Sequence, residues 1–355
     1  MKVLTYCTNS SYGSILQSLG LKKALAELGY DSTIIMSSAK PSEKYMDTLA
    51  KNRSPKSILL YLLKRLVIKK REKRYINTNK FINDHLDIEY YGTYENLCMN
   101  NSEEGIFIAG SDQIWNPKKL IPEFFLDFAN KKALKMSYAA SMGVLESGQL
   151  EKEIFANLIK NFDRISVREE DNVPFIKEIT DKTVSVNIDP TFLWESEEWR
   201  RLSSKYPVDK KYILVYPLYW DKKYNAQLKR LRQETDYDIV VIADNYRNIY
   251  ADIWVFDADP AQFLWLIDHA EAVVSSSFNC ISISIILNKK VASVINPASP
   301  SRIKSLLKVL EYPILKIEEL SMSKDIDWDM LNTNIANESE KGKSYLREAL
   351  IEHKK

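Results

Sequence analysis

Short runs of strand-forming apolar residues alternate with longer stretches of helical periodicity along most of this chain. In the first half, the strand-like runs include MKVLTYC at the N-terminus, residues 32–36, GIFIA at 105–109 and residues 165–167. Helical stretches such as residues 12–28 separate them. Because neighbouring parallel strands need crossover connections of this length, the alternation predicts an α/β fold with mostly parallel sheets.

The alternation starts again in the second half of the chain. Its strand-like runs lie at residues 212–216, 238–242, 253–255, 272–275 and 290–294. A chain of 355 residues exceeds what one hydrophobic core usually serves, so two Rossmann-like domains are expected. The polar stretch around Pro207 suggests domain limits of 1–205 and 206–330. A C-terminal segment, 331–355, follows, and its helix, expected at about residues 340–353, packs back.

The cysteines and the absence of targeting signals indicate the compartment. Cys7, Cys98 and Cys280 lie far apart without the spacing of a metal site, and their odd number argues against a disulfide framework. The N-terminus does not resemble a signal peptide, and no apolar run is long enough to span a membrane. We therefore expect a cytoplasmic protein without a bound metal.

Residues 51–75 form a strongly basic segment that holds ten Lys or Arg residues and one acid, Glu72. Leucines at positions 59, 62, 63 and 66 recur at helical spacing, which suits a helix lying on an anionic membrane surface. A solvated helix that packs by its leucines explains the pattern equally well. Nucleic-acid binding is not expected, because the basic run lacks interleaved aromatic residues and the rest of the chain is acidic.

The loop after the first strand has the composition of an anion site. Its residues Asn9, Ser11, Tyr12 and Gly13 are mostly small and polar, and they precede a helix whose first N–H groups can bind an anion. The loop lacks the GxGxxG pattern, so a dinucleotide site is not supported. We expect these four residues to contact a donor.

Two further strand ends carry ionisable side chains. Asp112 in GSDQIWNP could act as an acid or base, although it could equally cap its own turn. Arg168 follows the strand at 165–167 and could hold a phosphate or carboxylate, or else form surface ion pairs with Glu169 and Glu170.

The stretch VSSSFNCIS at 274–282 joins a predicted strand to a predicted helix. Small hydroxyl residues and free N–H groups at that helix start predict a second anion site. Its expected donor-binding residues are Ser276, Ser277, Phe278 and Cys280, and Asn279 stands at the position of greatest chemical interest. The two anion sites should face each other across a cleft between the domains.

Several blocks, taken in order, resemble the polysaccharide pyruvyl transferase family. They are NSSYGSILQSLGLKKAL, IAGSDQIWNP with FFLDF, KMSYAASMG, ISVREED, IDPTFLW and FLWLIDHAEAVVSSSFNCISISIILNKK, and they run from about residue 9 to 294. The resemblance implies a GT-B-like pair of domains. It also implies transfer of pyruvyl from phosphoenolpyruvate to a sugar, as a ketal, in the synthesis of cell-surface glycans. No cofactor or metal is implied, and the acceptor would be a glycan or a lipid-linked sugar.

The chain departs from the family where members usually read close to TDSFHG. Ser276 replaces the aspartate, Asn279 the histidine and Cys280 the glycine. A histidine suits proton transfer near pH 7, whereas an asparagine amide does not. Three hypotheses follow: another group, with Asp112 the first candidate, supplies the proton; the cleft transfers sugar from a nucleotide sugar; or the protein is a noncatalytic subunit that binds glycan precursors. We favour a transferase, with Asp112 and Asn279 as the candidate catalytic positions.

Overall fold

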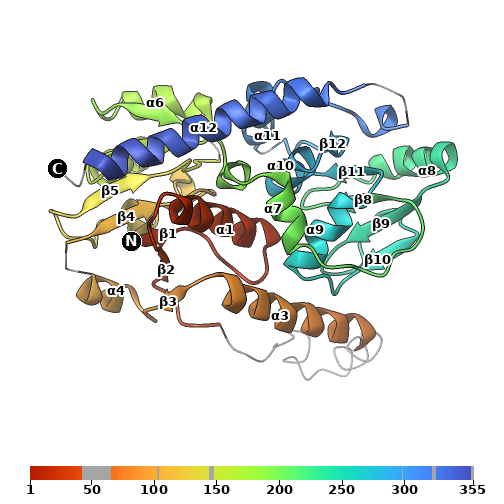
Figure 1. The fold of residues 1–355 in the computed structure, drawn as a ribbon, viewed down its shortest axis with the longest axis horizontal. Helices are drawn as coiled ribbons and strands as arrows, with labels where there is room; N and C mark the ends of the chain where they lie inside the picture. The colour runs from red at the N-terminus through yellow and green to blue at the C-terminus, as the bar shows by residue number, and fades with distance from the viewer. Residues whose placement is uncertain (42–64, 102–103, 144–147, 298, 322–324, 353–355) are drawn as a thin grey trace.

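The structure is a computed structural model, and it describes residues 1–41, 65–101, 104–143, 148–297, 299–321 and 325–352. Five parallel strands form the first sheet in the order β3-β2-β1-β4-β5 (Figure 1). They are β1 (Lys2–Leu4), β2 (Thr33–Met36), β3 (Ile88–Tyr90), β4 (Ile106–Ala109) and β5 (Leu134–Ser137). A parallel pair, β6 (Ile165–Val167) and β7 (Val184–Val186), continues beyond β5 through a bridge between Met136 and Arg164.

Helices cover both faces of the first sheet. They are α1 (Tyr12–Glu27), α4 (Tyr94–Asn100), α5 (Gln149–Ile159), α6 (Val173–Lys177) and α12 (Trp328–Glu352). Ile108 of β4 shares a core with Leu25 of α1 and Leu346 of α12, whereas its neighbour Phe107 shares a core with Leu97 of α4 and Phe155 of α5. Successive residues of a strand point to opposite faces, so the apolar run of β4 explains why both faces are covered.

The second sheet has the order β10-β9-β8-β11-β12, and all of its strands are parallel. They are β8 (Tyr212–Tyr216), β9 (Asp238–Ile242), β10 (Ile253–Val255), β11 (Ala272–Ser275) and β12 (Val291–Ser293). Its helices are α7 (Ser196–Leu202), α8 (Tyr224–Thr235), α9 (Pro260–Asp268), α10 (Phe278–Ile286) and α11 (Ser301–Val309). Strands β9 and β11 are buried along their whole length, as their continuous apolar runs predict.

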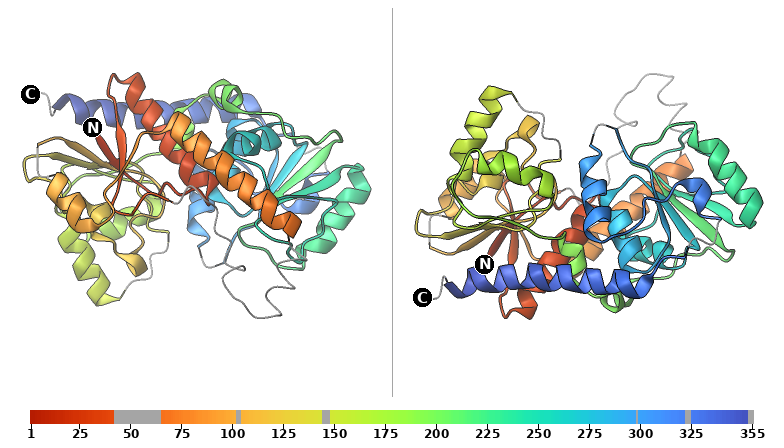
Figure 2. Two further views of the ribbon diagram at one scale, coloured as in Figure 1. Left: turned by 90° about the horizontal axis from the view of Figure 1, so that it is seen from below. Right: turned by 90° about the horizontal axis from the view of Figure 1, so that it is seen from above.

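The fold class expected from the sequence is confirmed, since the chain forms two Rossmann-like parallel sheets with flanking helices in a GT-B-like arrangement. Helix α12 returns across the molecule to the first sheet (Figure 2). There, Tyr345 Oη donates to the carbonyl oxygen of Ser137 at 2.9 Å. The helix begins at Trp328, about three turns before the helix expected from residue 340. The domain limits at 205 and 330 stay a prediction.

The first strand is shorter than MKVLTYC suggested. The ladder ends where Gly110 N donates to Leu4 O at 2.7 Å. The next bond is made by a side chain, because Thr5 Oγ1 donates to Ser111 O at 2.7 Å. Residues 5–11 are thereby released from the sheet to form the loop before α1.

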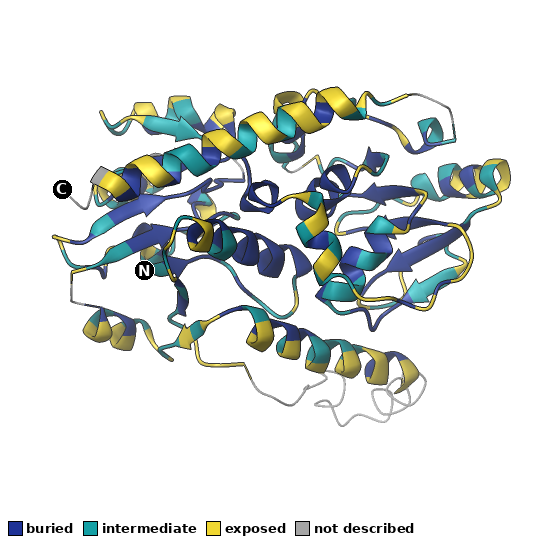
Figure 3. Ribbon diagram, viewed as in Figure 1, coloured by how far each residue is buried: buried dark blue, intermediate teal, exposed yellow. Residues whose placement is uncertain are grey.

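The basic segment 51–75 lies partly outside the described residues, which resume at residue 65. Helix α3 (Arg65–His85) carries its second half and continues ten residues past the expected end. Val67, Ile68, Phe81 and Ile82 are its buried apolar side chains, and the opposite side of the helix is exposed (Figure 3). Leucines 59, 62 and 63 lie outside the described residues. Leu66 is 79% exposed, so packing through leucine is wrong at that position.

Candidate functional site

The strand order indicates where each sheet should bind ligands. In the first sheet the order reverses between β1 and β4, and in the second it reverses between β8 and β11. Open parallel sheets bind their ligands beyond the carboxyl ends of the strands at such a reversal. The loops after β1, β4 and β11 hold most of the site residues predicted from the sequence.

The first turns of α1, which follows β1, and of α10, which follows β11, contact each other. A Cβ atom on Gly13 of α1 would lie 2.2 Å from Nδ2 of Asn279 in α10, so only glycine allows this approach. Asn279 is 8% exposed, and its Oδ1 has no hydrogen-bond partner in the described structure. A buried amide oxygen without a partner is costly unless something else satisfies it. The structure therefore brings the two predicted half-sites into contact and leaves one acceptor unsatisfied between them.

All three predicted site serines already make structural hydrogen bonds. Ser11 Oγ and Ser277 Oγ each accept from the backbone N–H three residues later, at 3.2 and 3.4 Å, and so cap α1 and α10. Ser276 Oγ accepts from the backbone N–H of Tyr219, after β8, at 2.8 Å. The two capped N–H groups are not available to an anion, and donor contacts from these serines stay a prediction.

Three other predicted donor-binding residues also have structural roles, two through hydrogen bonds and one through burial. Tyr12 Oη donates to the carbonyl oxygen of Ala258 at 2.6 Å, which joins α1 to the second half of the chain. Asn9 Nδ2 donates to Oδ1 of Asn79 in α3 at 3.2 Å. Cys280 is fully buried, and this burial raises the pKa of its thiol to about 12, so the thiol is neutral near pH 7. A donor contact from any of the three stays a prediction.

Arg168 lies in a buried network of ion pairs. Its Nε is 3.0 Å from Oε1 of Glu169, and its Nη1 is 2.8 Å from Oδ2 of Asp189. All three side chains are at least 96% buried. Burial alone would lower the pKa of Arg168, but Glu169 and Asp189 together raise it above its ordinary value. The alternative of surface ion pairs with Glu169 and Glu170 is therefore wrong, because the pairs are buried and the second partner is Asp189.

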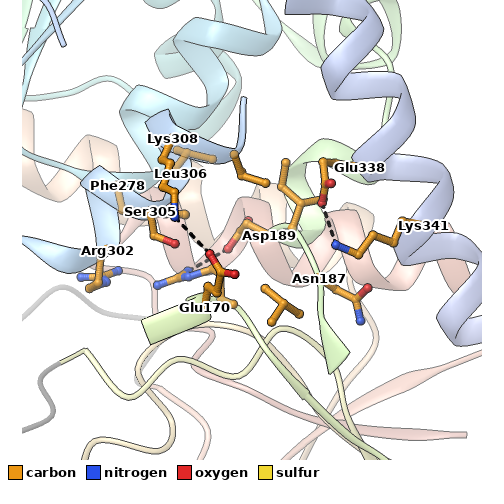
Figure 4. Close-up of a pocket in the computed structure, with 14 residues that line it drawn as sticks. Glu170, Asn187, Asp189, Phe278, Arg302, Ser305, Leu306, Lys308, Glu338 and Lys341 are labelled. Atoms are coloured by element: carbon orange, nitrogen blue, oxygen red, sulfur yellow. Dashed lines mark hydrogen bonds and ion pairs between the residues drawn. The ribbon is translucent and has the colours of Figure 1, made fainter. Parts of the chain in front are cut away.

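A cavity of about 250 Å³ lies beside Arg168, between α11, α12 and the segments that follow β6 and β7 (Figure 4). Its lining comprises Arg168, Glu170, Val186, Asn187, Ile188, Asp189, Phe278, Arg302, Ser305, Leu306, Lys308, Val309, Glu338 and Lys341. Of the residues predicted from the sequence, Arg168 and Phe278 line this cavity. Nη2 of Arg168 is buried without a hydrogen-bond partner in the described structure.

Arg302 of α11 is a site residue that the sequence reasoning missed. The ring of Phe278 has the guanidinium carbon of Arg168 at 3.9 Å from its centre and that of Arg302 at 5.4 Å. Burial, and then the charge of Arg168, lower the pKa of Arg302 to about 10. Arginine in the first turn of a helix opposes the helix dipole, and this local misfit is the sequence signal that could have identified it.

Asp112 lies close to Arg302 and has an unusual backbone conformation. Its Oδ1 is 4.0 Å from Nη2 of Arg302, and the same oxygen accepts a hydrogen bond from the N–H of Gln113 at 2.7 Å. Its φ of +76° is in the left-handed region, where a residue other than glycine costs about 1–3 kcal/mol. Asp112 thus caps its own turn and also presents a carboxylate to Arg302.

The described residues meet the needs of neither a metal site nor a membrane span. His, Cys, Asp and Glu side chains form no group of three there that could hold a metal ion. Within the same residues, every helix is too short or too polar to cross a membrane.

The chain resembles several solved structures at low sequence identity. The UDP-GlcNAc 2-epimerase from Neisseria meningitidis is 13% identical over 99% of this chain and 100% of that chain, with a TM-score of 0.49. The UDP-GlcNAc 2-epimerase from Methanocaldococcus jannaschii is 12% identical over 90% of this chain and 98% of that chain, with a TM-score of 0.46. The glycosyltransferase SnogD from Streptomyces nogalater is 8% identical over 96% and 97% of the two chains, with a TM-score of 0.39.

No curated protein sequence matches the chain. The model of one protein family, described as polysaccharide pyruvyl transferase, matches residues 12–297. This range includes the Gly13–Asn279 contact and Arg168. The chain therefore belongs to the polysaccharide pyruvyl transferase family.

Proposed function

We propose that the protein binds phosphoenolpyruvate beside Arg168 and transfers its pyruvyl group to two hydroxyls of a sugar, as a ketal. The observation that supports this most directly is the buried Arg168, whose Nη2 has no partner and which lines a cavity. An N–H group left in this state gains a charge-assisted hydrogen bond when a phosphate or carboxylate binds.

The size of the cavity favours a small donor. Drug-sized ligands usually occupy pockets of about 300–1,000 Å³, whereas this cavity holds about 250 Å³. A three-carbon enol phosphate suits that space better than a nucleotide sugar does. We therefore place phosphoenolpyruvate first among the donors.

Asp112 is the group to which we assign the proton transfer. In ketal formation the two sugar hydroxyls lose two protons, of which one ends on the methylene carbon of the donor and the other leaves with phosphate. We propose that the Asp112 carboxylate accepts a proton from the first attacking hydroxyl and passes it to the methylene carbon. The hydroxyl oxygen bonds to the adjacent carbon, and attack by the second hydroxyl displaces phosphate. Asp112 Oδ1 lies 4.0 Å from Nη2 of Arg302, which lines the cavity, so the carboxylate is close to the proposed donor site.

We further propose that the acceptor is a glycan precursor at the cytoplasmic face of a membrane. Lys69 and Lys70 of α3 are exposed beside Leu66, so this part of the helix could lie on an anionic surface. Lys73 and Arg74 contribute less, because they pair with Asp257 and Asp244. The three cysteines are free thiols, as suits a reducing compartment.

The first experiment is a thermal-shift titration of the full chain with phosphoenolpyruvate and, separately, with nucleotide sugars. A ligand that binds the native state raises its melting temperature, so the donor should be the one that stabilises the protein. Stabilisation by nucleotide sugars alone would replace the proposed donor, and stabilisation by neither would favour a noncatalytic subunit.

The second experiment measures release of phosphate from phosphoenolpyruvate in the presence of glycan acceptors, followed by mass detection of the ketal. Asp112→Asn should lower this rate by about 100-fold or more, since general acid–base groups contribute about 10²–10⁴-fold. Glu123→Gln, in the short helix Pro122–Phe125, is the matched control, because it removes one half-buried carboxylate that does not line the cavity. Equal rates for the Asp112 variant and the wild type would remove Asp112 from the mechanism.

A further inference from the structure

Arg302 has the properties of a ligand-binding residue that lacks its ligand. Its side chain is 15% exposed, and its Nε is buried without a hydrogen-bond partner in the described structure. The carboxylate of Asp112 lies 4.0 Å from its Nη2, which is longer than a hydrogen bond. A guanidinium buried to this degree is normally held by closer carboxylates or carbonyl oxygens.

The contrast with the other cations of the cavity supports this reading. Arg168 is neutralised by two carboxylates within 3.0 Å. Lys308 pairs with Glu170 at 3.3 Å, and Lys341 pairs with Glu338 at 3.4 Å (Figure 4). Of these four cations that line the cavity, Arg302 therefore has the longest ion pair, at 4.0 Å to Asp112.

The position of Arg302 beside Arg168 is a second reason to expect an anionic ligand. Both guanidinium groups lie against the ring of Phe278, so two positive charges share one small cavity. Each retains a buried N–H group without a partner, on Nη2 of Arg168 and Nε of Arg302. Like charges this close repel unless an anion lies between them. The ligand that fits this arrangement is a small molecule with two or more negative charges.

We propose that Arg302 is a second donor-binding residue, which binds one anionic group of a small phosphate-bearing ligand while Arg168 binds another. The proposal deepens the proposed function, because phosphoenolpyruvate carries a carboxylate and a phosphate on adjacent atoms. When the ligand binds, Arg302 exchanges its long contact with Asp112 for a shorter contact with the anion. The residue thus couples occupation of the cavity to release of the Asp112 carboxylate.

The test is calorimetric titration of the full-length wild type and three variants with phosphoenolpyruvate and with inorganic phosphate, at fixed ionic strength. Arg302→Met should weaken phosphoenolpyruvate binding about 10- to 100-fold, because a charge-assisted hydrogen bond is lost. Arg302→Lys should give an intermediate loss, since it keeps the charge but lacks Nε and the planar fork. Lys304→Met removes an exposed cation from the same helix and should change the affinity less than twofold.

The melting temperature without ligand separates binding from folding. Arg302→Met removes a buried charge without a close partner, so the ligand-free protein should melt at the same temperature as the wild type or higher. The variant should lose the rise in melting temperature that phosphoenolpyruvate gives the wild type. A lower melting temperature together with unchanged ligand affinity would mean that Arg302 is purely structural, and the proposal would be wrong.

The outcomes for the site and for the donor are distinguishable. If the wild type binds inorganic phosphate through Arg302 but not phosphoenolpyruvate, the anion site stands and the proposed donor is wrong. If phosphoenolpyruvate binds the wild type and Arg302→Met equally well, the donor stands and the role of Arg302 is wrong. Binding of neither ligand to the wild type would overturn both.

Discussion

The contact between Gly13 and Asn279 allows a direct test of how closely the two halves of the site approach. In Gly13→Ala, the new Cβ would lie 2.2 Å from Nδ2 of Asn279 and 2.8 Å from its Cβ and Cγ. Carbon atoms normally pack at about 3.5–4.0 Å. The amide group of Asn279 could rotate away, but its Cβ moves only if α10 moves. To bring the Cβ–Cβ distance to the lower limit of that range, α10 would have to shift by roughly 0.7 Å.

The expected cost follows from two opposing effects. Overpacking in a buried contact usually costs about 1–3 kcal/mol, whereas replacing a helical glycine by alanine gains about 0.5–1 kcal/mol. We therefore expect Gly13→Ala to lower the free energy of unfolding by about 1–2 kcal/mol. Gly105→Ala, outside a helix and just before β4, is the control for a Cβ without a close contact, because the nearest atom to its new Cβ would be 3.6 Å away.

Second substitutions at Asn279 should relieve the strain in a graded way. Asn279→Ala removes Cγ and Nδ2 but leaves the Cβ, so it should restore part of the stability lost in Gly13→Ala. Asn279→Gly also removes the Cβ and should restore nearly all of the overpacking cost. The assay is urea unfolding, with a double-mutant cycle for each pair. Coupling energies below about 0.3 kcal/mol, or equal losses for Gly13→Ala and Gly105→Ala, would refute the close approach of α1 and α10.

Three further predictions concern other parts of the molecule. Arg168→Met should lower the free energy of unfolding by about 3–5 kcal/mol, because it leaves two buried carboxylates unpaired; urea unfolding that shows a loss below 1 kcal/mol would contradict the buried network. In the native protein a thiol reagent at pH 8 should label Cys98 alone, since burial raises the pKa of Cys7 and of Cys280 to about 12. Labelling of all three thiols at pH 8 without unfolding would contradict this burial. The same raised pKa values mean that the stability from keeping the two thiols neutral is present below about pH 9 and is lost as the pH rises toward 12. A Lys69→Glu, Lys70→Glu variant should sediment less with vesicles rich in anionic phospholipid at low salt, and equal sedimentation of variant and wild type would remove α3 from membrane contact.

The strands of the second sheet were the most predictable part of the fold. The strands at 212–216, 238–242, 253–255 and 272–275 have the predicted limits, because continuous apolar runs of this length form buried parallel strands. The helix limits were less predictable. Helix α12 does place Trp328, Leu331 and Ile335 at helical spacing against the core, but three apolar residues among polar neighbours are a weak signal, so the predicted helix began too late.

The partners within the site were the least predictable part. Arg168 is followed directly by Glu169 and Glu170 in the sequence, which suggested surface pairs. The structure buries the pair with Glu169 and makes Asp189, not Glu170, the second partner, because the parallel register of β6 and β7 brings the ends of the two strands together. Arg302 reaches the same cavity from α11, more than 130 residues from Arg168. A local signal, the arginine in the first turn of α11, could have marked Arg302, but its partners depend on tertiary packing.

Asn279→His is the substitution that addresses the departure from the family pattern. If Asn279 is a lesion in an otherwise ordinary pyruvyl transferase, a histidine there should create or raise phosphoenolpyruvate-dependent ketal formation. The imidazole is bulkier than the amide and meets Gly13 at close range, so the single variant alone should be strained. Ser276→Asp can orient the imidazole and still accept the hydrogen bond from Tyr219 N. Cys280→Gly restores the small residue that the family pattern has next to the histidine.

The triple variant should therefore exceed both the wild type and Asn279→His in phosphate release and in ketal detected by mass. Lower activity of the triple variant would also have a clear physical meaning. The unsatisfied Oδ1 of Asn279 would then be an acceptor that the native ligand uses, and replacing it would weaken donor binding. Loss of phosphoenolpyruvate binding in the triple variant, with its fold intact, would show that asparagine serves a working site of different chemistry and is not a lesion.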